Sequence, residues 1–383
     1  MRIIGLMSGT SLDGIDAALV NVIGTGYDID VTLVRAKTVA YEEELRSQLL
    51  QICAGHPRSI ETLATLDDAV ADTFAQAALD LAQGESIDLI ASHGQTVYHR
   101  PPTDEALGYS LQIGRGARIA DRTRRPTVSN FRAADIALGG QGAPLVPPVD
   151  ACLLSHRHHD RCVQNLGGIG NVAYLPAWDR QQQQHFPAAI QGWDTGPANV
   201  LIDWAVSDFS NGLHTYDDDG QWAAQGNAHL PLVQQWLSHP FFTQRPPKST
   251  GRELFGADYA RACWHQAQAL DLSEADFLAS LTEFTVASIE QGYRQFLPTL
   301  PQEVLLCGGG SRNGYLRQRL QARLPEMALL TTDQAGLHAD YKEAIAFAVL
   351  GFWHWHGFPG NLPAVTGARA LCPLGELNPP RGQ

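Results

Sequence analysis

Near the start of the chain, residues 5–16 have the sequence GLMSGTSLDGID. The preceding residues 2–7 are mostly apolar and predict a buried strand, and the pattern of the following residues 15–22 predicts a second strand. The pair Asp13–Gly14 favours a tight turn between the two segments. We therefore expect an antiparallel β-hairpin with this glycine-rich segment at its turn.

The turn of this hairpin is also a candidate phosphate site. Glycine lets the backbone approach a ligand closely, and Thr10 and Ser11 add hydroxyl groups that can bind phosphate oxygens. Asp13 or Asp16 could hold Mg²⁺, because carboxylate together with phosphate is the usual magnesium environment. A plain hairpin turn explains the same residues, so the segment taken alone leaves both interpretations open.

A second glycine-rich segment lies in residues 161–176, RCVQNLGGIGNVAYLP, which predict strand, turn and strand. Gly168, Gly170 and Ala173 have the spacing of the dinucleotide-binding fingerprint. That fingerprint must open a helix, whereas NVAYLP is typical of a strand. A hairpin that binds phosphate, or an ordinary hairpin, therefore fits better than a dehydrogenase motif.

A third segment, residues 303–313 with the sequence EVLLCGGGSRN, predicts a strand that ends in three glycines. Its backbone could lie flat against a nucleobase or ribose, or it could be an ordinary strand-to-helix turn. A Walker loop is excluded, because none of Lys37, Lys248 and Lys342 follows a glycine.

Residues 192–199, GWDTGPAN, contain one Asp-Thr-Gly triplet, and an aspartic protease would need a second. Asp194 is then either a residue that stabilises a turn or caps a helix, or a general base. It lies just before a helix that we expect to begin at Pro197. His93 follows a predicted strand, where ligands gather in α/β folds, and Arg132 could pair with a substrate carboxylate. The histidines of the segment SHRHHD lack metal-ligand spacing and predict a solvated loop.

The order of predicted elements indicates an α/β protein with two related halves. We place a domain boundary in the Gly- and Pro-rich residues 139–148, with an N-terminal lobe of 1–145 and a C-terminal lobe of 146–383. We allow for a final segment that returns to the N-terminal lobe. The glutamines 181–184 predict a surface insertion between two strands. Further predictions are a strand at 31–41 and helices at 42–53, 60–82, 273–297 and 340–355.

The composition excludes several classes of protein. The 383 residues carry a net charge of −13, which argues against nucleic acid and anionic membranes as partners. The six cysteines form no CxxC pair, and neither a signal peptide nor a run of 18 apolar residues is present. These features predict a soluble cytoplasmic protein.

Two glycine-rich hairpins, one in each half, and a late strand with three glycines are features of one fold. It is the two-lobed actin-like or sugar-kinase fold, ribonuclease H-like in each lobe, with a central cleft. In this fold the hairpins hold the phosphates of ATP and the late glycines hold the adenosine. We therefore predict an α/β protein of this class.

The motifs also resemble those of one family, the anhydro-N-acetylmuramic acid kinases, in the same order from residue 5 to about 367. The resemblance implies an ATP- and Mg²⁺-dependent phosphotransferase that converts 1,6-anhydro-N-acetylmuramic acid, ATP and water into N-acetylmuramic acid 6-phosphate and ADP, a step in cell-wall recycling. It also implies a homodimer. The matching segments are MSGTSLDGID, ASHGQTV, GGQGAPLVP, NLGGIGN, DTGPAN, KSTGRE and CGGGSRN.

The resemblance assigns Asp194 as the base that activates the attacking water. Of the two carboxylates of the first turn, we predict Asp13 as the metal ligand. One departure is Asn130, because many members have aspartate at this position. Residues that fall in sugar-pocket motifs are His93, Gln95, Arg132 and Glu343. Residues expected to bind the nucleotide are Gly9, Thr10, Ser11, Leu12, Asp13, Gly14, Ile15, Asp16, Asn165, Gly167, Gly168, Gly170, Asn171, Gly308, Gly309, Gly310 and Asn313.

Two other classes of function remain open from the sequence. A different sugar or carboxylate kinase of the same fold would need no water, and Asp194 would deprotonate the acceptor itself. A non-enzymatic filament or sugar-sensing regulator is the third hypothesis. A regulator would usually add a helix-turn-helix and a basic face, neither of which is seen here.

Overall fold

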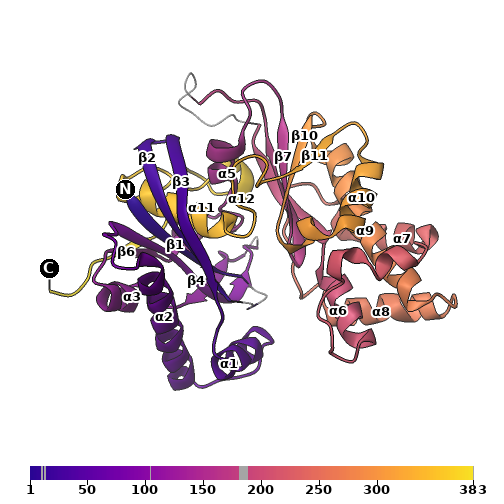
Figure 1. Ribbon diagram of the computed structural model, residues 1–383, viewed down its shortest axis with the longest axis horizontal. Coiled ribbons are helices and arrows are strands. Elements are labelled where there is room, and N and C mark those ends of the chain that lie inside the picture. The colour runs from indigo at the N-terminus through magenta and orange to yellow at the C-terminus, as the bar shows by residue number, and fades with distance from the viewer. Residues whose placement is uncertain (10–11, 13, 104, 181–188, 383) are drawn as a thin grey trace. The chain divides into compact units, whose positions relative to one another are not determined.

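The computed structural model describes residues 1–9, 12, 14–103, 105–180 and 189–382 (Figure 1). Two compact units divide these residues, and the chain passes from the first to the second after Leu153. The described residues of 1–153 and 341–382, with Arg180, form the first unit. The other described residues between 154 and 340 form the second. The predicted glutamine insertion at 181–184 lies outside the described residues.

The first unit is built on a seven-stranded sheet in the order β12-β6-β4-β1-β2-β3, with β5 paired to β4. Strands β1, β2 and β3 are antiparallel neighbours, which confirms the predicted hairpin of the first two, whereas β1, β4 and β6 run parallel. The strands are β1 Arg2–Ser8, β2 Ile15–Thr25, β3 Asp28–Val39, β4 Leu89–Arg100, β5 Tyr109–Ile113, β6 Thr127–Ser129 and β12 Glu376–Asn378.

Helices cover both faces of this sheet. Ile4 and Leu6 of β1 belong to a core that α2 closes, whereas Gly5 points to α11, as the alternation of a strand requires. Figure 1 shows α11, in yellow, beside the indigo strands, so the end of the chain completes the core of its beginning. The helices are α1 Glu43–Cys53, α2 Ile60–Ala82, α3 Gly116–Thr123, α4 Phe131–Ala137, α5 Pro147–Leu154, α11 Lys342–Trp355 and α12 Pro363–Thr366.

The second unit contains a five-stranded sheet in the order β11-β10-β7-β8-β9. Here too, three antiparallel strands come first and two parallel strands follow, because β7, β10 and β11 run parallel. This repeated order, with helices packed on the sheets, confirms the predicted α/β fold of the actin-like and sugar-kinase class. The strands are β7 Arg161–Leu166, β8 Ile169–Leu175, β9 Gln191–Pro197, β10 Glu303–Cys307 and β11 Ala328–Thr331.

The helix expected to begin at Pro197 begins instead at Val200, so that prediction was wrong. Pro197 is the last residue of β9, and the backbone N–H of Ala198 donates to Gly168 O at 3.0 Å. This contact with the glycine turn delays the first helical turn. The remaining helices of the second unit are α6 Val200–Phe209, η1 Asp218–Gly220, η2 Ala223–Gln225, α7 Leu230–Leu237, η3 Pro240–Thr243, α8 Ala257–Gln268, α9 Glu274–Phe296, η4 Gly309–Arg312 and α10 Gly314–Arg323.

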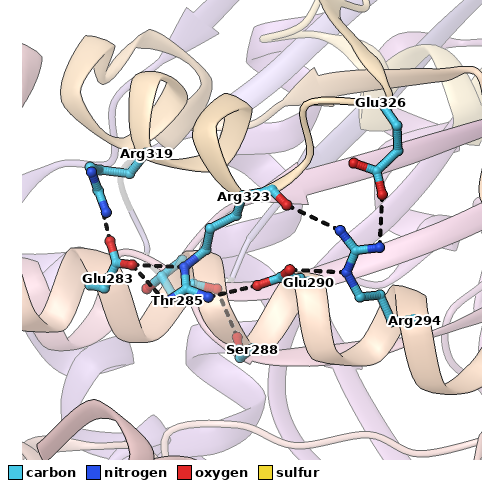
Figure 2. A network of polar contacts seen from close by, with 8 residues as sticks. All are labelled: Glu283, Thr285, Ser288, Glu290, Arg294, Arg319, Arg323 and Glu326. Carbon is cyan, nitrogen blue, oxygen red and sulfur yellow. Dashed lines mark hydrogen bonds and ion pairs between the residues drawn. The ribbon is translucent and has the colours of Figure 1, made fainter. Parts of the chain in front are cut away.

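Helices α9 and α10 are joined by a network of ion pairs (Figure 2). The Glu283 carboxylate, 2% exposed, accepts from Nε of Arg319 at 2.8 Å and of Arg323 at 2.7 Å. Arg323 also reaches Glu290 at 2.6 Å, and Arg294 continues the network. The network therefore anchors α10, the helix that follows the glycines 308–310 in the chain.

In the part of the chain that the structure describes, helices long and apolar enough to cross a membrane are absent.

Candidate active site

The turn of the first hairpin is fastened to the sheet at both ends. Ser8 Oγ donates to Gly14 O at 2.8 Å, and Gln95 Nε2 donates to Gly9 O at 3.2 Å. Gly14 has φ +155°, and a Cβ there would lie 2.8 Å from Val39 O, so only glycine fits. Thr10, Ser11 and Asp13 lie outside the described residues, and with them the predicted metal ligand.

Among the other residues predicted in this turn, Leu12 and Ile15 are fully buried core residues. Only their backbone groups remain to contact a ligand, and Leu12 O already accepts from Arg46 Nε at 2.9 Å. Asp16 is the second residue of β2, beside the turn, and accepts a hydrogen bond from Thr38 Oγ1 at 2.6 Å. It is thus the described carboxylate nearest in sequence to the glycine turn.

The second glycine turn joins β7 to β8. Gly167 O accepts from the N–H of Asn199, and Gly168 O accepts from that of Val200, both at 3.0 Å. The turn carbonyls are therefore occupied by the start of α6. Its sides are held by the buried Gln164, whose Nε2 donates to the carbonyl oxygens of Asn165 and Asn171.

Packing explains only one glycine of this second turn. A Cβ at Gly170 would lie 2.6 Å from Thr195 Oγ1, whereas the nearest atoms to a Cβ at Gly167 or Gly168 are at 3.5 and 3.8 Å. The protein itself would tolerate a side chain at these two positions. A ligand that approaches the backbone would explain why glycine stands there.

Of the three glycines after β10, packing within the protein explains two and leaves the third unexplained. Gly308 has φ +77° and a Cβ there would lie 2.3 Å from Asn165 Oδ1, and a Cβ at Gly310 would lie 2.8 Å from Asn199 Oδ1. Gly309 has nothing within 4 Å of its Cβ position. Asn313 follows, and its side chain caps α10 by accepting from Leu316 N–H at 2.9 Å. Its oxygen is thereby engaged within the protein.

Asp194 lies in β9, where its backbone N–H donates to Lys248 O at 3.0 Å. Its carboxylate Oδ2 accepts from the N–H of Thr250 at 2.8 Å. Asp194 thus sits between strand β8, with Asn171 opposite it, and the segment 248–250. Lys248 Nζ is buried, donates to Phe241 O at 3.0 Å and lies 4.6 Å from the centre of the Phe241 ring.

Burial raises the pKa of Asp194 to about 7, and the negative charge of Glu253 adds to this shift. The Thr250 N–H and the charge of Lys248 act in the opposite direction and do not cancel it. Burial also lowers the pKa of Lys248 to about 8. A carboxyl group with a near-neutral pKa is suited to general-base catalysis at physiological pH.

In the first unit, the buried His93 and the half-buried Arg132 form a hydrogen-bonded pair. The Arg132 guanidinium donates to His93 Nε2 at 3.1 Å from Nε and 2.8 Å from Nη2, and His93 Nδ1 lies 2.9 Å from Gly94 O. These contacts fit a neutral imidazole with its proton on Nδ1. In agreement, burial and then the charge of Arg132 lower the pKa of His93 well below its ordinary value.

Glu343, at the start of α11, supplies the opposite charge to this pair. Burial raises the pKa of Glu343, and the charges of Lys342 and Arg132 oppose the shift. Burial likewise lowers the pKa of Arg132 to about 10, so its guanidinium stays charged at neutral pH. The structure therefore brings together three of the four residues predicted for the sugar.

The fourth, Gln95, is fully buried and its amide is used within the protein. Its Oε1 accepts from Tyr41 OH at 3.1 Å, and its Nε2 also reaches Thr96 O at 3.2 Å. Gln95 thus links the first glycine turn to β4. Asn130 has φ +54° and its Nδ2 donates to Glu376 Oε1 at 2.8 Å, so an aspartate at this position would face a like charge.

Several polar residues around these groups were not predicted from the sequence. Lys342 pairs with Asp150 at 2.7 Å, and Asp135 accepts from the N–H of Gly142, whose carbonyl holds Arg132 at 2.7 Å. Thr250 and Lys248 lie in the motif KSTGRE, which was the available signal. Within the described ranges, clusters of His, Cys, Asp or Glu that could hold a metal ion are absent.

Open glycine positions after β7 and after β10, and a half-buried carboxyl group of near-neutral pKa, are features expected of a phosphotransferase of the sugar-kinase class. A sequence model of the family "Anhydro-N-acetylmuramic acid kinase" matches residues 1–380, and the chain belongs to this family.

Curated relatives agree with this assignment. The chain is 58% identical over 379 residues to the anhydro-N-acetylmuramic acid kinase of Microcystis aeruginosa, with 98% of this chain and 100% of the relative covered. It is 59% identical over 380 residues to that of Acaryochloris marina, with 99% and 100% covered. It is 57% identical over 384 residues to that of a Synechocystis strain, with 99% and 98% covered.

Proposed function

We propose that the protein converts 1,6-anhydro-N-acetylmuramic acid, ATP and water into N-acetylmuramic acid 6-phosphate and ADP. The observation that supports this most is Asp194, a half-buried carboxyl group with a pKa of about 7 in the strand next to the second glycine turn. A kinase that must also add water needs a base for that water. A plain hydroxyl kinase needs a base only for its acceptor.

In the proposed reaction, ionised Asp194 takes a proton from water as the water oxygen attacks C1 of the sugar. The bond from C1 to O6 breaks and its electron pair goes to O6. O6 then attacks the γ-phosphorus of ATP, and the bond to the β-phosphate oxygen breaks to leave ADP. Because O6 passes directly to phosphorus, no second carboxylate has to protonate it, unlike in an inverting glycosidase.

The backbone of the two glycine turns would bind the phosphates of ATP through N–H groups, and Gly309 would lie against the adenosine. The open Cβ positions at Gly167, Gly168 and Gly309 fit a ligand at these places. Asp13 would be the ligand for Mg²⁺, with Asp16, a carboxylate at the end of the first turn, as the other candidate. When bound, Mg²⁺ would neutralise phosphate charge.

For the sugar, the charged Arg132 would bind oxygen atoms through its remaining N–H groups, and Glu343 would accept from a hydroxyl or amide N–H. His93 would contribute by orienting Arg132, because both of its ring nitrogens are engaged within the protein. The pair is preorganised, because the Arg132 guanidinium is held by both His93 and Gly142 O. We further propose a cytoplasmic homodimer that acts in the recycling of cell-wall sugars, as the family resemblance implies.

The test is incubation with ATP, Mg²⁺ and 1,6-anhydro-N-acetylmuramic acid in ¹⁸O-water, followed by mass spectrometry of the sugar. We expect a phosphorylated sugar with one ¹⁸O atom, and none with Asp194→Asn. Efficient phosphorylation of reducing N-acetylmuramic acid, with the anhydro sugar left intact, would contradict the proposal and favour a plain sugar kinase.

A further inference from the structure

We propose that the hydroxyl group of Thr250 orients the attacking water against Asp194, an inference that rests on the proposed function. The first observation is the contact between these residues. The Thr250 N–H donates to Asp194 Oδ2 at 2.8 Å, and two residues earlier Lys248 O accepts from the Asp194 N–H at 3.0 Å. The segment 248–250 therefore runs along Asp194 and is held to it by two backbone hydrogen bonds.

The second observation is the hydroxyl group itself. Thr250 Oγ1 is buried and has no hydrogen-bond partner among the described residues. Leaving a buried hydroxyl unpaired costs about 1–3 kcal/mol, so such a group calls for an explanation. Covalent geometry keeps Oγ1 within about 6.5 Å of Asp194 Oδ2, because it is only three bonds from the bonded nitrogen.

Trp193, next to Asp194 in the chain, also has a side-chain polar group without a partner among the described residues, but this group is not placed beside the Asp194 carboxylate. Trp193 Nε1 is also buried without a partner among the described residues, but its ring belongs to an apolar core with Val286 and Ile289. Successive residues of a strand point to opposite faces, so Trp193 and Asp194 face different surroundings. Of the two unpaired groups, only Thr250 is placed to act together with the Asp194 carboxylate.

In this proposal, a water molecule is the hydrogen-bond partner of Thr250 Oγ1. Asp194 Oδ2 is engaged by the Thr250 N–H, so Oδ1 remains to take the proton that water loses. The Thr250 oxygen accepts a hydrogen bond from the second hydrogen of the same water. Two acceptors fix the water, and one of its lone pairs then points at C1 of the sugar. Thr250 itself neither gains nor loses a proton.

The test compares Thr250→Val, which keeps the shape and the backbone N–H but lacks the hydroxyl, with Thr250→Ser, which keeps the hydroxyl. We expect Thr250→Val to lower kcat on the order of 100-fold with KM for sugar and for ATP within about twofold of wild type. Thr250→Ser should stay within about fivefold of wild type. The control Thr65→Val, the same substitution at an exposed threonine of α2, should leave kcat unchanged.

The melting temperature separates this role from a structural one. Removing an unpaired buried hydroxyl should leave the melting temperature of Thr250→Val unchanged or raise it. The inference is overturned if kcat of Thr250→Val equals that of wild type, if only KM for the sugar rises, or if lost activity accompanies a lower melting temperature. If wild-type protein incorporates no ¹⁸O into product, the proposed function fails first, and the inference with it.

Discussion

The pKa of Asp194 is raised because the protein removes water from the carboxyl group without supplying a positive charge that fully compensates. Lys248 is near enough to lower the pKa, but its ammonium group bonds to Phe241 O and lies over an aromatic ring. Glu253 adds a like charge. The ionised form is therefore held at a cost in stability, which is a common feature of catalytic groups.

Replacing Asp194 by asparagine should reduce kcat about 1,000-fold, because general-base catalysis contributes between about 100- and 10,000-fold. For wild type, log(kcat/KM) should rise with unit slope as pH increases and level off above about pH 7, where Asp194 is ionised. The measurement is kcat/KM for the anhydro sugar from pH 5 to 9. A flat profile across pH 6–8 would argue against Asp194 as the base.

The same shift predicts how stability depends on pH. The pKa of Asp194 is raised in the folded state. The contribution of this group to the free energy of unfolding is therefore fully present below its unfolded pKa, about 4, and is lost as pH rises through about 7. The asparagine side chain of the variant does not ionise. We therefore expect Asp194→Asn to be more stable than wild type by about 2–4 kcal/mol at pH 8, with no difference at pH 4. Urea unfolding at both pH values measures this, and an equal difference at both would contradict the assigned pKa.

Gly308 and Gly309 should respond differently to alanine. A Cβ at Gly308 would collide with Asn165 Oδ1, whereas Gly309 has open space. We expect Gly309→Ala to keep the wild-type melting temperature and to raise KM for ATP about tenfold, or about 1.4 kcal/mol. Gly308→Ala should lower the melting temperature. An unchanged KM for ATP in Gly309→Ala would remove this residue from the nucleotide site.

At the scale of secondary-structure elements, the contact between α9 and α10 depends on one buried carboxylate (Figure 2). Burial alone would raise the pKa of Glu283, but hydrogen bonds and charges from Arg319 and Arg323 lower it overall. Both arginines are on α10, so Glu283 of α9 forms ion pairs with two successive turns of α10. This favours ionised Glu283 in the folded protein.

Glu283→Gln should lower the free energy of unfolding by about 3 kcal/mol at pH 7, because it leaves two arginines without their shared partner. Since the folded pKa is lowered, the contribution is present above the unfolded pKa and is lost as pH falls through the folded value. The difference from wild type should therefore shrink below pH 4, as seen by urea unfolding.

The control is Asp258→Asn in the exposed pair Arg261–Asp258, where we expect a change of less than about 0.5 kcal/mol. A similar loss in both variants would show that burial is not what makes Glu283 important.

At the scale of the whole molecule, residues from both ends of the chain complete one core. Helix α11 packs on β1, β2 and β4, and it approaches so closely that a Cβ at Gly5 would lie 1.8 Å from Ala344 O. The backbone of a buried helix cannot move aside at low cost. The first unit therefore cannot form fully until the end of the chain is present.

We expect Gly5→Ala to destabilise the protein by about 3 kcal/mol or more and to lower hydrogen-exchange protection in both β1 and α11. The matched control is Gly292→Ala in α9, where a Cβ would make ordinary contact at 3.5 Å with Trp193 Nε1. That variant should be as stable as wild type or more stable by up to about 1 kcal/mol. Equal stability of both variants would contradict the observed packing.

Much of the fold could be predicted from the sequence, because hairpins and helices depend mainly on residues that are close together in the chain. The alternation in 15–22 and the glycines of 167–170 predicted two hairpins, and the long helices α2 and α9 lie where their patterns predict. The repeated order of these elements was sufficient for the fold class. The helix at 197 was placed too early, since contacts with Gly167 and Gly168 delay its start.

Tertiary structure alone decided which of these residues meet and how polar their surroundings are. The approach of α11 to Gly5, the pairing of His93 with Arg132, and the contact of Thr250 with Asp194 join residues far apart in the chain. A pKa depends on burial and on neighbouring charges, neither of which a local pattern contains. Local periodicity therefore specified the elements of this protein, while the near-neutral pKa of Asp194 and the unpaired hydroxyl beside it arise only when those elements pack.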